Sequence, residues 1–187
     1  MKSCIVYPFL SHLNFSSGYF WAMELARKIS VPLVLVTIVS RKYSQREKKA
    51  FHHAYTQAHA AYTLQAGNIL PESSINTQHI CLEAEGLCPI DEFAPKLAAF
   101  AAQKTDAILV LPPDLFSTAD QAQLIDSSYS AILLPQGIDQ TVTPASEKFY
   151  DVFRSSHHVR MHRKVLHELS KDRALFNYFT SVFGRKH

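Results

Sequence analysis

Five short apolar runs recur along the first three quarters of the chain. Most are nearly uninterrupted and rich in β-branched residues, which is typical of strands buried on both faces of a parallel sheet. Polar, turn-forming stretches separate them. We expect strands at Ser3–Phe9, Pro32–Val39, Gln78–Ala84, Asp106–Leu111 and Ser130–Leu134.

Between these runs, apolar residues recur every three or four positions, which predicts helices with one buried face. Two of the helices follow capping boxes, Ser44-x-x-Glu47 and Thr118-x-x-Gln121. The alternating order predicts an open, five-stranded, mostly parallel α/β sheet with helices on both faces, because parallel crossovers are right-handed. The predicted helices are Ser16–Ser30, Arg46–Ala66, Asp91–Lys104 and Ala119–Ser127.

The pattern changes after a Pro/Ser/Thr-rich joint at residues 143–146. Apolar and aromatic residues then predict two helices, Glu147–Ser170, weak near Ser155-Ser156-His157, and Asp172–Phe183. We therefore divide the chain into an α/β domain, residues 1–143, and a helical extension, residues 144–187. Aromatic residues at this density should pack on the body, on a second subunit or on another partner.

Charge separates the same two parts. Residues 1–146 contain 10 Lys or Arg and 12 Asp or Glu, whereas residues 147–187 contain 9 Lys or Arg and 4 Asp or Glu. The net charge of the 187 residues is +3. The first residues fit neither a secretory signal nor a membrane span, so we expect a cytoplasmic protein without membrane association. Three cysteines without CxxC spacing indicate neither a disulfide framework nor a structural zinc site.

Three phrases of the α/β part resemble the universal stress protein (UspA-like) family: Ile5–Pro8, Ala22–Lys28 leading into Pro32–Val39, and Phe100–Val110. The resemblance covers roughly residues 2–136. It implies the adenine-nucleotide alpha hydrolase-like fold with strand order 3-2-1-4-5 and a ligand cleft between strands one and four. It also implies a homodimer through the last strand, Ser130–Pro135, to which we add a role for the C-terminal helices.

The sequence departs from that family after the fourth strand. Nucleotide-binding members carry a G-x2-G-x9-G-[S/T] loop there, whereas this chain has Pro112-Pro113-Asp114 and no glycine between Gly86 and Gly137. The prolines remove two backbone donors, and the aspartate adds negative charge where phosphates would lie. We therefore expect no ATP or AMP binding of the usual kind.

The cleft between strands one and four remains the candidate ligand site. The simpler expectation is that its apolar residues fill the cleft and leave no room for a ligand. Its serines precede the first helix, where they would cap it or bind an anion. The candidates are Pro8, Phe9, Ser11, Ser16, Ser17, Val39, Leu111 and Pro112.

No catalytic constellation is evident, so we expect no enzyme. Cys4 and Cys81 lie in predicted strands, where a thiol stays protonated, and Cys88 is the one thiol placed to react. His158 and His162 share the spacing of two zinc ligands on a helix, but they lack a third ligand, and we expect no metal.

These patterns favour a regulatory or structural homodimer that resembles universal stress proteins. One alternative is a nucleotide or small-ligand receptor that uses the cleft. A second is a nucleic-acid-associated protein acting through the basic tail, which we do not favour because Glu168 and Asp172 interrupt its charges. Those charges are Arg154, Arg160, Arg163, Lys164, Lys171 and Arg173.

Overall fold

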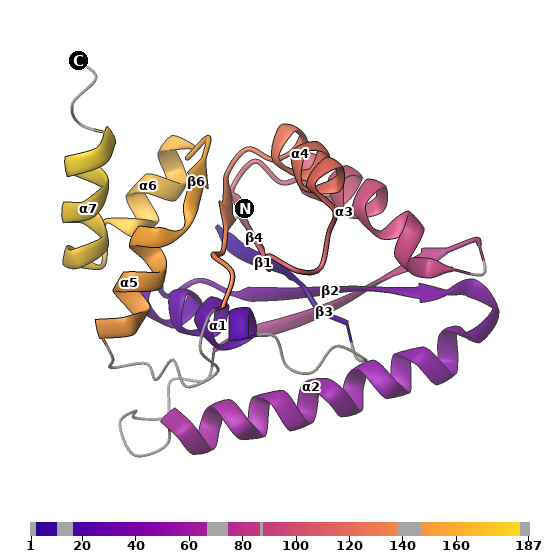
Figure 1. Cartoon of the computed structure of the whole chain (residues 1–187). Coiled ribbons are helices and arrows are strands. Elements are labelled where there is room, and N and C mark those ends of the chain that lie inside the picture. The colour runs from indigo at the N-terminus through magenta and orange to yellow at the C-terminus, as the bar shows by residue number, and fades with distance from the viewer. Residues whose placement is uncertain (1–2, 11–16, 67–74, 87, 138–146, 184–187) are drawn as a thin grey trace.

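A computed structural model describes residues 3–10, 17–66, 75–86, 88–137 and 147–183, and its centre is a six-stranded sheet (Figure 1). The strand order is β3-β2-β1-β4-β5-β6, and the first five strands in the chain pair in parallel with one another. The predicted class and the order 3-2-1-4-5 are therefore confirmed. The strands are β1 Cys4–Pro8, β2 Leu33–Ser40, β3 Thr77–Ala84, β4 Ala107–Leu111, β5 Ala131–Leu133 and β6 His157–Val159.

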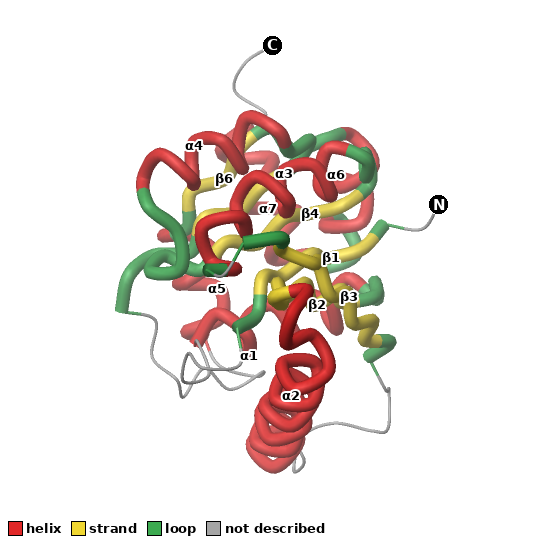
Figure 2. Tube along the Cα trace, turned by 90° about the vertical axis from the view of Figure 1, so that its right-hand side faces the viewer, coloured by secondary structure: helices red, strands yellow, loops and turns green. Residues whose placement is uncertain are grey.

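Helices cover both faces of this sheet (Figure 1). Alternate strand residues face opposite sides, so Ile5 and Tyr7 pack towards α1 and α2, whereas Val6 packs towards α3 and α4. Figure 2 shows α2 projecting beyond the sheet. The helices are α1 Ser17–Ile29, α2 Ser44–Ala66, α3 Phe93–Ala102, α4 Thr118–Ser127, α5 Glu147–Ser155, α6 Arg163–Leu169 and α7 Arg173–Phe183, with 3-10 turns η1 Arg41–Tyr43 and η2 Pro89–Glu92.

The C-terminal segment differs from the prediction. The expected helix Glu147–Ser170 is divided into α5, β6 and α6. The hydroxyls of Ser155 and Ser156 both donate to the Val152 carbonyl, at 3.1 and 2.6 Å, so these side chains compete for a helical acceptor where α5 ends. The chain then turns through Arg160, whose φ is 48°.

β6 covers the outer edge of β5. The two strands are antiparallel, with Ile132 opposite His158 and Leu133 opposite His157. The edge of β5 is therefore paired, as its hydrophobicity predicts, but within the same chain, so it is not available for strand pairing in the homodimer expected through Ser130–Pro135. β3, at the other end of the sheet, pairs with β2 alone among the described strands.

Two aromatic residues of the C-terminal segment, Phe149 and Phe153, pack on α1, whereas Phe176 on α7 is 46% exposed. The Trp21 ring stacks on Phe149, with centroids 5.2 Å apart, and on Phe153, at 6.0 Å. The Trp21 indole also donates to the Phe149 carbonyl at 3.2 Å. The predicted burial of these aromatics is confirmed, and it occurs within the chain. Within the described ranges, no helix has the length and apolarity that crossing a membrane requires.

Candidate functional site

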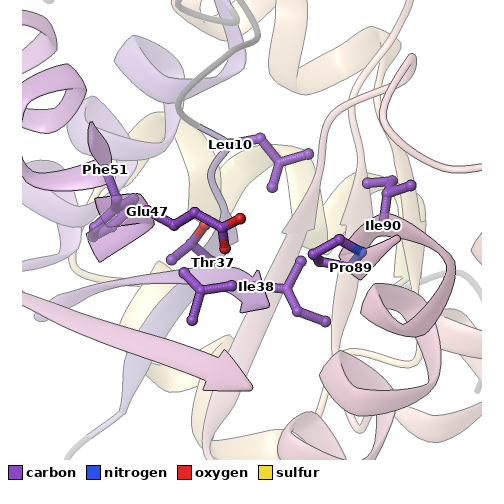
Figure 3. Close-up of a pocket in the computed structure, with 8 residues that line it drawn as sticks. Leu10, Thr37, Ile38, Glu47, Phe51, Pro89 and Ile90 are labelled. Carbon is purple, nitrogen blue, oxygen red and sulfur yellow. The ribbon is translucent and has the colours of Figure 1, made fainter. Parts of the chain in front are cut away.

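A pocket of about 280 Å³ opens at the carboxyl end of β2, between α2 and η2 (Figure 3). β2 supplies Thr37, Ile38 and Val39, while the residues after β1, α2 and η2 supply the other walls. This edge is where open parallel sheets present ligand sites, because the loops that follow the strands meet there. Its apolar lining consists of Leu10, Ile38, Val39, Phe51, Pro89 and Ile90.

Glu47 is the one ionisable side chain among the lining residues that the structure describes. Its Oε2 accepts a hydrogen bond of 2.5 Å from the backbone N–H of Ser40, which is the last residue of β2. This contact corrects the predicted capping box, in which Glu47 would reach back to Ser44. The turn η1 brings the end of β2 within reach of the carboxylate instead, and it anchors one oxygen at the pocket. The other oxygen, Oε1, makes no hydrogen bond with a described residue.

Packed aromatic rings support the α2 wall of the pocket. Phe51, 3% exposed, lies edge-on to Phe9, with centroids 5.5 Å apart, and Phe9 lies 5.7 Å from Tyr19. On β3, His79 contacts Phe51 from another side, at 5.5 Å. These contacts fix the ring that faces the pocket, so this wall is preformed. Thr37, 3% exposed, adds a hydroxyl to the lining.

The apolar cleft candidates are buried, as expected for a filled cleft: Pro8, Phe9, Val39, Leu111 and Pro112. Only Val39 lines the pocket described above. Leu111 packs in the cluster under α3 and α4, on the opposite face of the sheet from Phe9, so the two do not form one surface.

The polar candidates of the cleft stand differently. Ser17 begins α1, and Ser11 and Ser16 lie outside the described residues. α1 approaches the sheet closely at Gly18, where an added Cβ would lie 2.8 Å from the Tyr7 hydroxyl and 2.9 Å from Leu134 Cδ1. A larger residue would require the Tyr7 and Leu134 side chains or the start of the helix to shift.

The loop after β4 is closed by its own side chains. Gln121 Nε2 donates to the carbonyls of Pro113, at 3.1 Å, and Phe116, at 3.0 Å. Ser117 caps α4 by accepting a 3.2 Å hydrogen bond from the Asp120 N–H. The cap of α4 is therefore Ser117, one residue before Thr118, which the predicted capping box Thr118-x-x-Gln121 places at the cap. The loop uses its polar groups internally: the Ser117 hydroxyl also donates to Asp120 Oδ2 at 2.6 Å. The negative charges of Asp120 and Asp114 oppose an anion.

The two histidines with ligand spacing do not share a helix face. His158 lies in β6, whereas His162 is the N-cap of α6 and its Nδ1 accepts from the Lys164 N–H at 3.4 Å. In the described ranges, no group of three or more His, Cys, Asp or Glu is placed to hold a metal. Burial is the main cause that raises the pKa of the Cys4 and Cys81 thiols, and Cys88 is exposed.

Comparison with known proteins gives no family. No family model matches the chain, and no curated protein matches it. Among solved structures, it is similar to an α,α-trehalose 6-phosphate synthase from Burkholderia multivorans, with a TM-score of 0.43 and 11% sequence identity. The match covers 96% of this chain and 39% of the synthase chain, so this chain spans well under half of that protein.

Sequence reasoning did not find most of the pocket. Glu47 was visible as a capping residue, but its role beside Ser40 depends on the turn η1. Pro89 and Ile90 reach the pocket through η2, and no periodicity marks them as neighbours of β2. The usable signal was the rule that ligands bind beyond the carboxyl ends of parallel strands.

Proposed function

We propose that this protein is a non-enzymatic regulatory protein, similar in kind to universal stress proteins, that binds a small molecule in the pocket at the carboxyl end of β2. The observation that carries the proposal is the Glu47 carboxylate held at the edge of a preformed apolar pocket. Few convergent polar groups in an apolar lining are typical of small-molecule sites.

The chemistry of the pocket favours a small apolar ligand with one ammonium group. A volume of about 280 Å³ lies just below the usual range for ligand pockets, so the ligand has few heavy atoms. An ammonium would donate to Glu47 in a partly dehydrated environment, where charge-assisted hydrogen bonds are strong. The Thr37 hydroxyl offers a second polar contact.

Two observations support a binding role over the alternatives. The loop after β4 is closed by Gln121, which opposes phosphate binding of the usual kind. Thr37 and Glu47 are the polar side chains of the described lining, and no hydrogen bond joins them, so the described residues hold no nucleophile paired with a base. The homodimer that the resemblance implies stays a prediction, and its interface has to lie away from β5.

Titration with cyclohexylamine and with the uncharged isostere cyclohexanol, followed by amide NMR shifts, tests the proposal. We expect the amine to bind about tenfold more tightly, equivalent to roughly 1.4 kcal/mol, and to shift the amides around Ile38 and Phe51. Glu47→Gln should remove this preference, because it keeps an acceptor for Ser40 but loses the charge. The control is Glu85→Gln, an exposed carboxylate outside the pocket, which should keep the preference.

Two results would contradict the proposal. One is an equal response to amine and alcohol in the unsubstituted protein. The other is micromolar binding of ATP, ADP or AMP with shifts centred on the loop after β4, which would restore the nucleotide-receptor alternative.

A further inference from the structure

The amino-terminal half of α2 and the turn before it carry a dense positive charge. Between positions 41 and 53 the chain has five Lys or Arg, two His and one acidic residue, Glu47. The carboxylate of Glu47 turns to the Ser40 N–H and to the pocket. We call the seven exposed basic side chains the basic face of α2: Arg41, Lys42, Arg46, Lys48, Lys49, His52 and His53.

Three of the five Lys or Arg residues have no ionic partner among the residues that the structure describes. Lys48 pairs with Glu83, Nζ to Oε1 at 3.2 Å, and both side chains are nearly half exposed. Arg41, Arg46 and Lys49 form no ion pair with any residue that the structure describes. A surface with several unneutralised like charges attracts a polyanion and raises its association rate.

The arrangement suits an extended anionic strand. Arg46, Lys49 and His53 follow one side of the helix at i, i+3 and i+7, over about 10 Å at the α-helical rise. Beside them is an open hollow that Lys48, Lys49, His52, His53 and Thr56 line. The exposed imidazole rings provide flat surfaces on which unpaired bases can stack, next to cations that contact phosphates.

The other face of α2 argues against a lipid surface. Its apolar side chains are already buried against the sheet, at Phe51, Ala54, Ala58 and Tyr62. A helix that binds a membrane buries such a face among the lipids, and here none is left beside the basic residues. We propose that the basic face of α2 binds single-stranded nucleic acid through its phosphodiester backbone.

Fluorescence anisotropy of a labelled short oligonucleotide with the full chain tests this proposal. Contacts to three to five phosphates predict a slope of about −2 to −3.5 in log K against log salt. Reversing two charges, Arg46→Glu with Lys49→Glu, should weaken binding at least tenfold and reduce the magnitude of the slope by about 1.4. Acidic residues in the first turns of a helix are favourable, so α2 should persist, and circular dichroism will show it.

The matched control makes the same charge change in the C-terminal segment, Arg163→Glu with Arg173→Glu, at two exposed positions. We expect an affinity within about twofold of the unsubstituted protein, apart from a weak general charge effect. Equal weakening by both pairs would overturn the proposal, because it would indicate attraction by net charge alone. Absence of binding at low salt would overturn it, and so would equal affinity for phosphatidylserine vesicles with the same dependence on Arg46 and Lys49.

Discussion

The basic face of α2 and the C-terminal segment look alike in the sequence, since both combine basic residues with aromatic ones, but they differ in the structure. In the C-terminal segment, four of the six basic side chains named above have acidic partners, whereas Arg163 and Arg173 have none among the described residues. Lys164 binds Asp106 at 3.0 Å, a hydrogen bond that lowers the pKa of that carboxyl. The remaining pairs are Arg154 with Asp151, Arg160 with Asp126 and Lys171 with Glu168. On the basic face of α2, Lys48 pairs with Glu83, whereas Arg41, Arg46 and Lys49 form no ion pair with a described residue.

The difference concerns the aromatic residues as well. Phe149 and Phe153 are at most 1% exposed and lie against Trp21, so the C-terminal segment is part of the core. The basic residues of α2 lie on the side of the helix away from the core. A count of charges therefore does not identify an interaction surface. What identifies it is charge that remains exposed and unpaired after folding.

The largest expected effect is a loss of stability when Phe149 is shortened. Phe149→Ala removes a ring with no exposed surface and leaves a cavity beside Trp21, so we expect the free energy of unfolding to fall by about 3–5 kcal/mol. On α2, Leu64 is 81% exposed, so Leu64→Ala should change the free energy of unfolding by less than about 0.5 kcal/mol. Urea unfolding measures both. Similar effects at the two positions would remove the distinction between a core segment and a surface helix.

The sequence predicted the larger elements well because each has a strong local signal. β2 is buried along its whole length, and its uninterrupted apolar run predicted a buried strand there. α2, predicted at Arg46–Ala66, is observed at Ser44–Ala66. β6 was missed because His157–Val159 has three residues and no apolar alternation, and it is a strand only because the edge of β5 is beside it.

The site was less predictable for the same reason. Of the predicted cleft residues that the structure describes, Val39 alone lines the pocket, since the prediction depended on a family cleft whose loop this chain replaces. Glu47 is one turn into α2, and its bond to Ser40 follows from the geometry of η1. Such contacts depend on how separate segments are placed in the fold, and a short stretch of sequence does not determine that placement.

A smaller effect should follow from removing Lys28, the cation that joins α1 to the C-terminal segment. Its ammonium donates to the Tyr150 hydroxyl at 2.9 Å and lies 3.6 Å from Glu24 and 3.7 Å from Asp172. Glu24 is fully buried, but it retains Arg27 as a partner. Lys28→Met should therefore lower the free energy of unfolding by about 1.5–3 kcal/mol.

The matched substitution on α2 is Lys48→Met. It breaks the half-exposed pair with Glu83, which should contribute less than about 1 kcal/mol. Chemical unfolding of both variants compares the same substitution in the two regions. A cost at Lys48 equal to that at Lys28 would show that the α2 charges are part of the folded core after all.

The smallest expected effect is a pH dependence of stability on the α2 side. His79 on β3 packs against Tyr55, with ring centroids 4.0 Å apart, and burial, followed by the charges of His52 and His59, lowers its pKa. Because the pKa of this histidine is lower in the folded chain, the unfolded chain binds the proton at a higher pH than the folded chain does. The contribution of His79 to the free energy of unfolding is therefore complete above about pH 6.5 and decreases as the pH falls. When the pH is lowered from 7.5 to 5.5, the melting temperature should decrease less in His79→Gln than in the unsubstituted protein. In the C-terminal segment, exposed His167→Gln should leave the loss unchanged. An unchanged loss in His79→Gln would show that its proton uptake is not linked to folding.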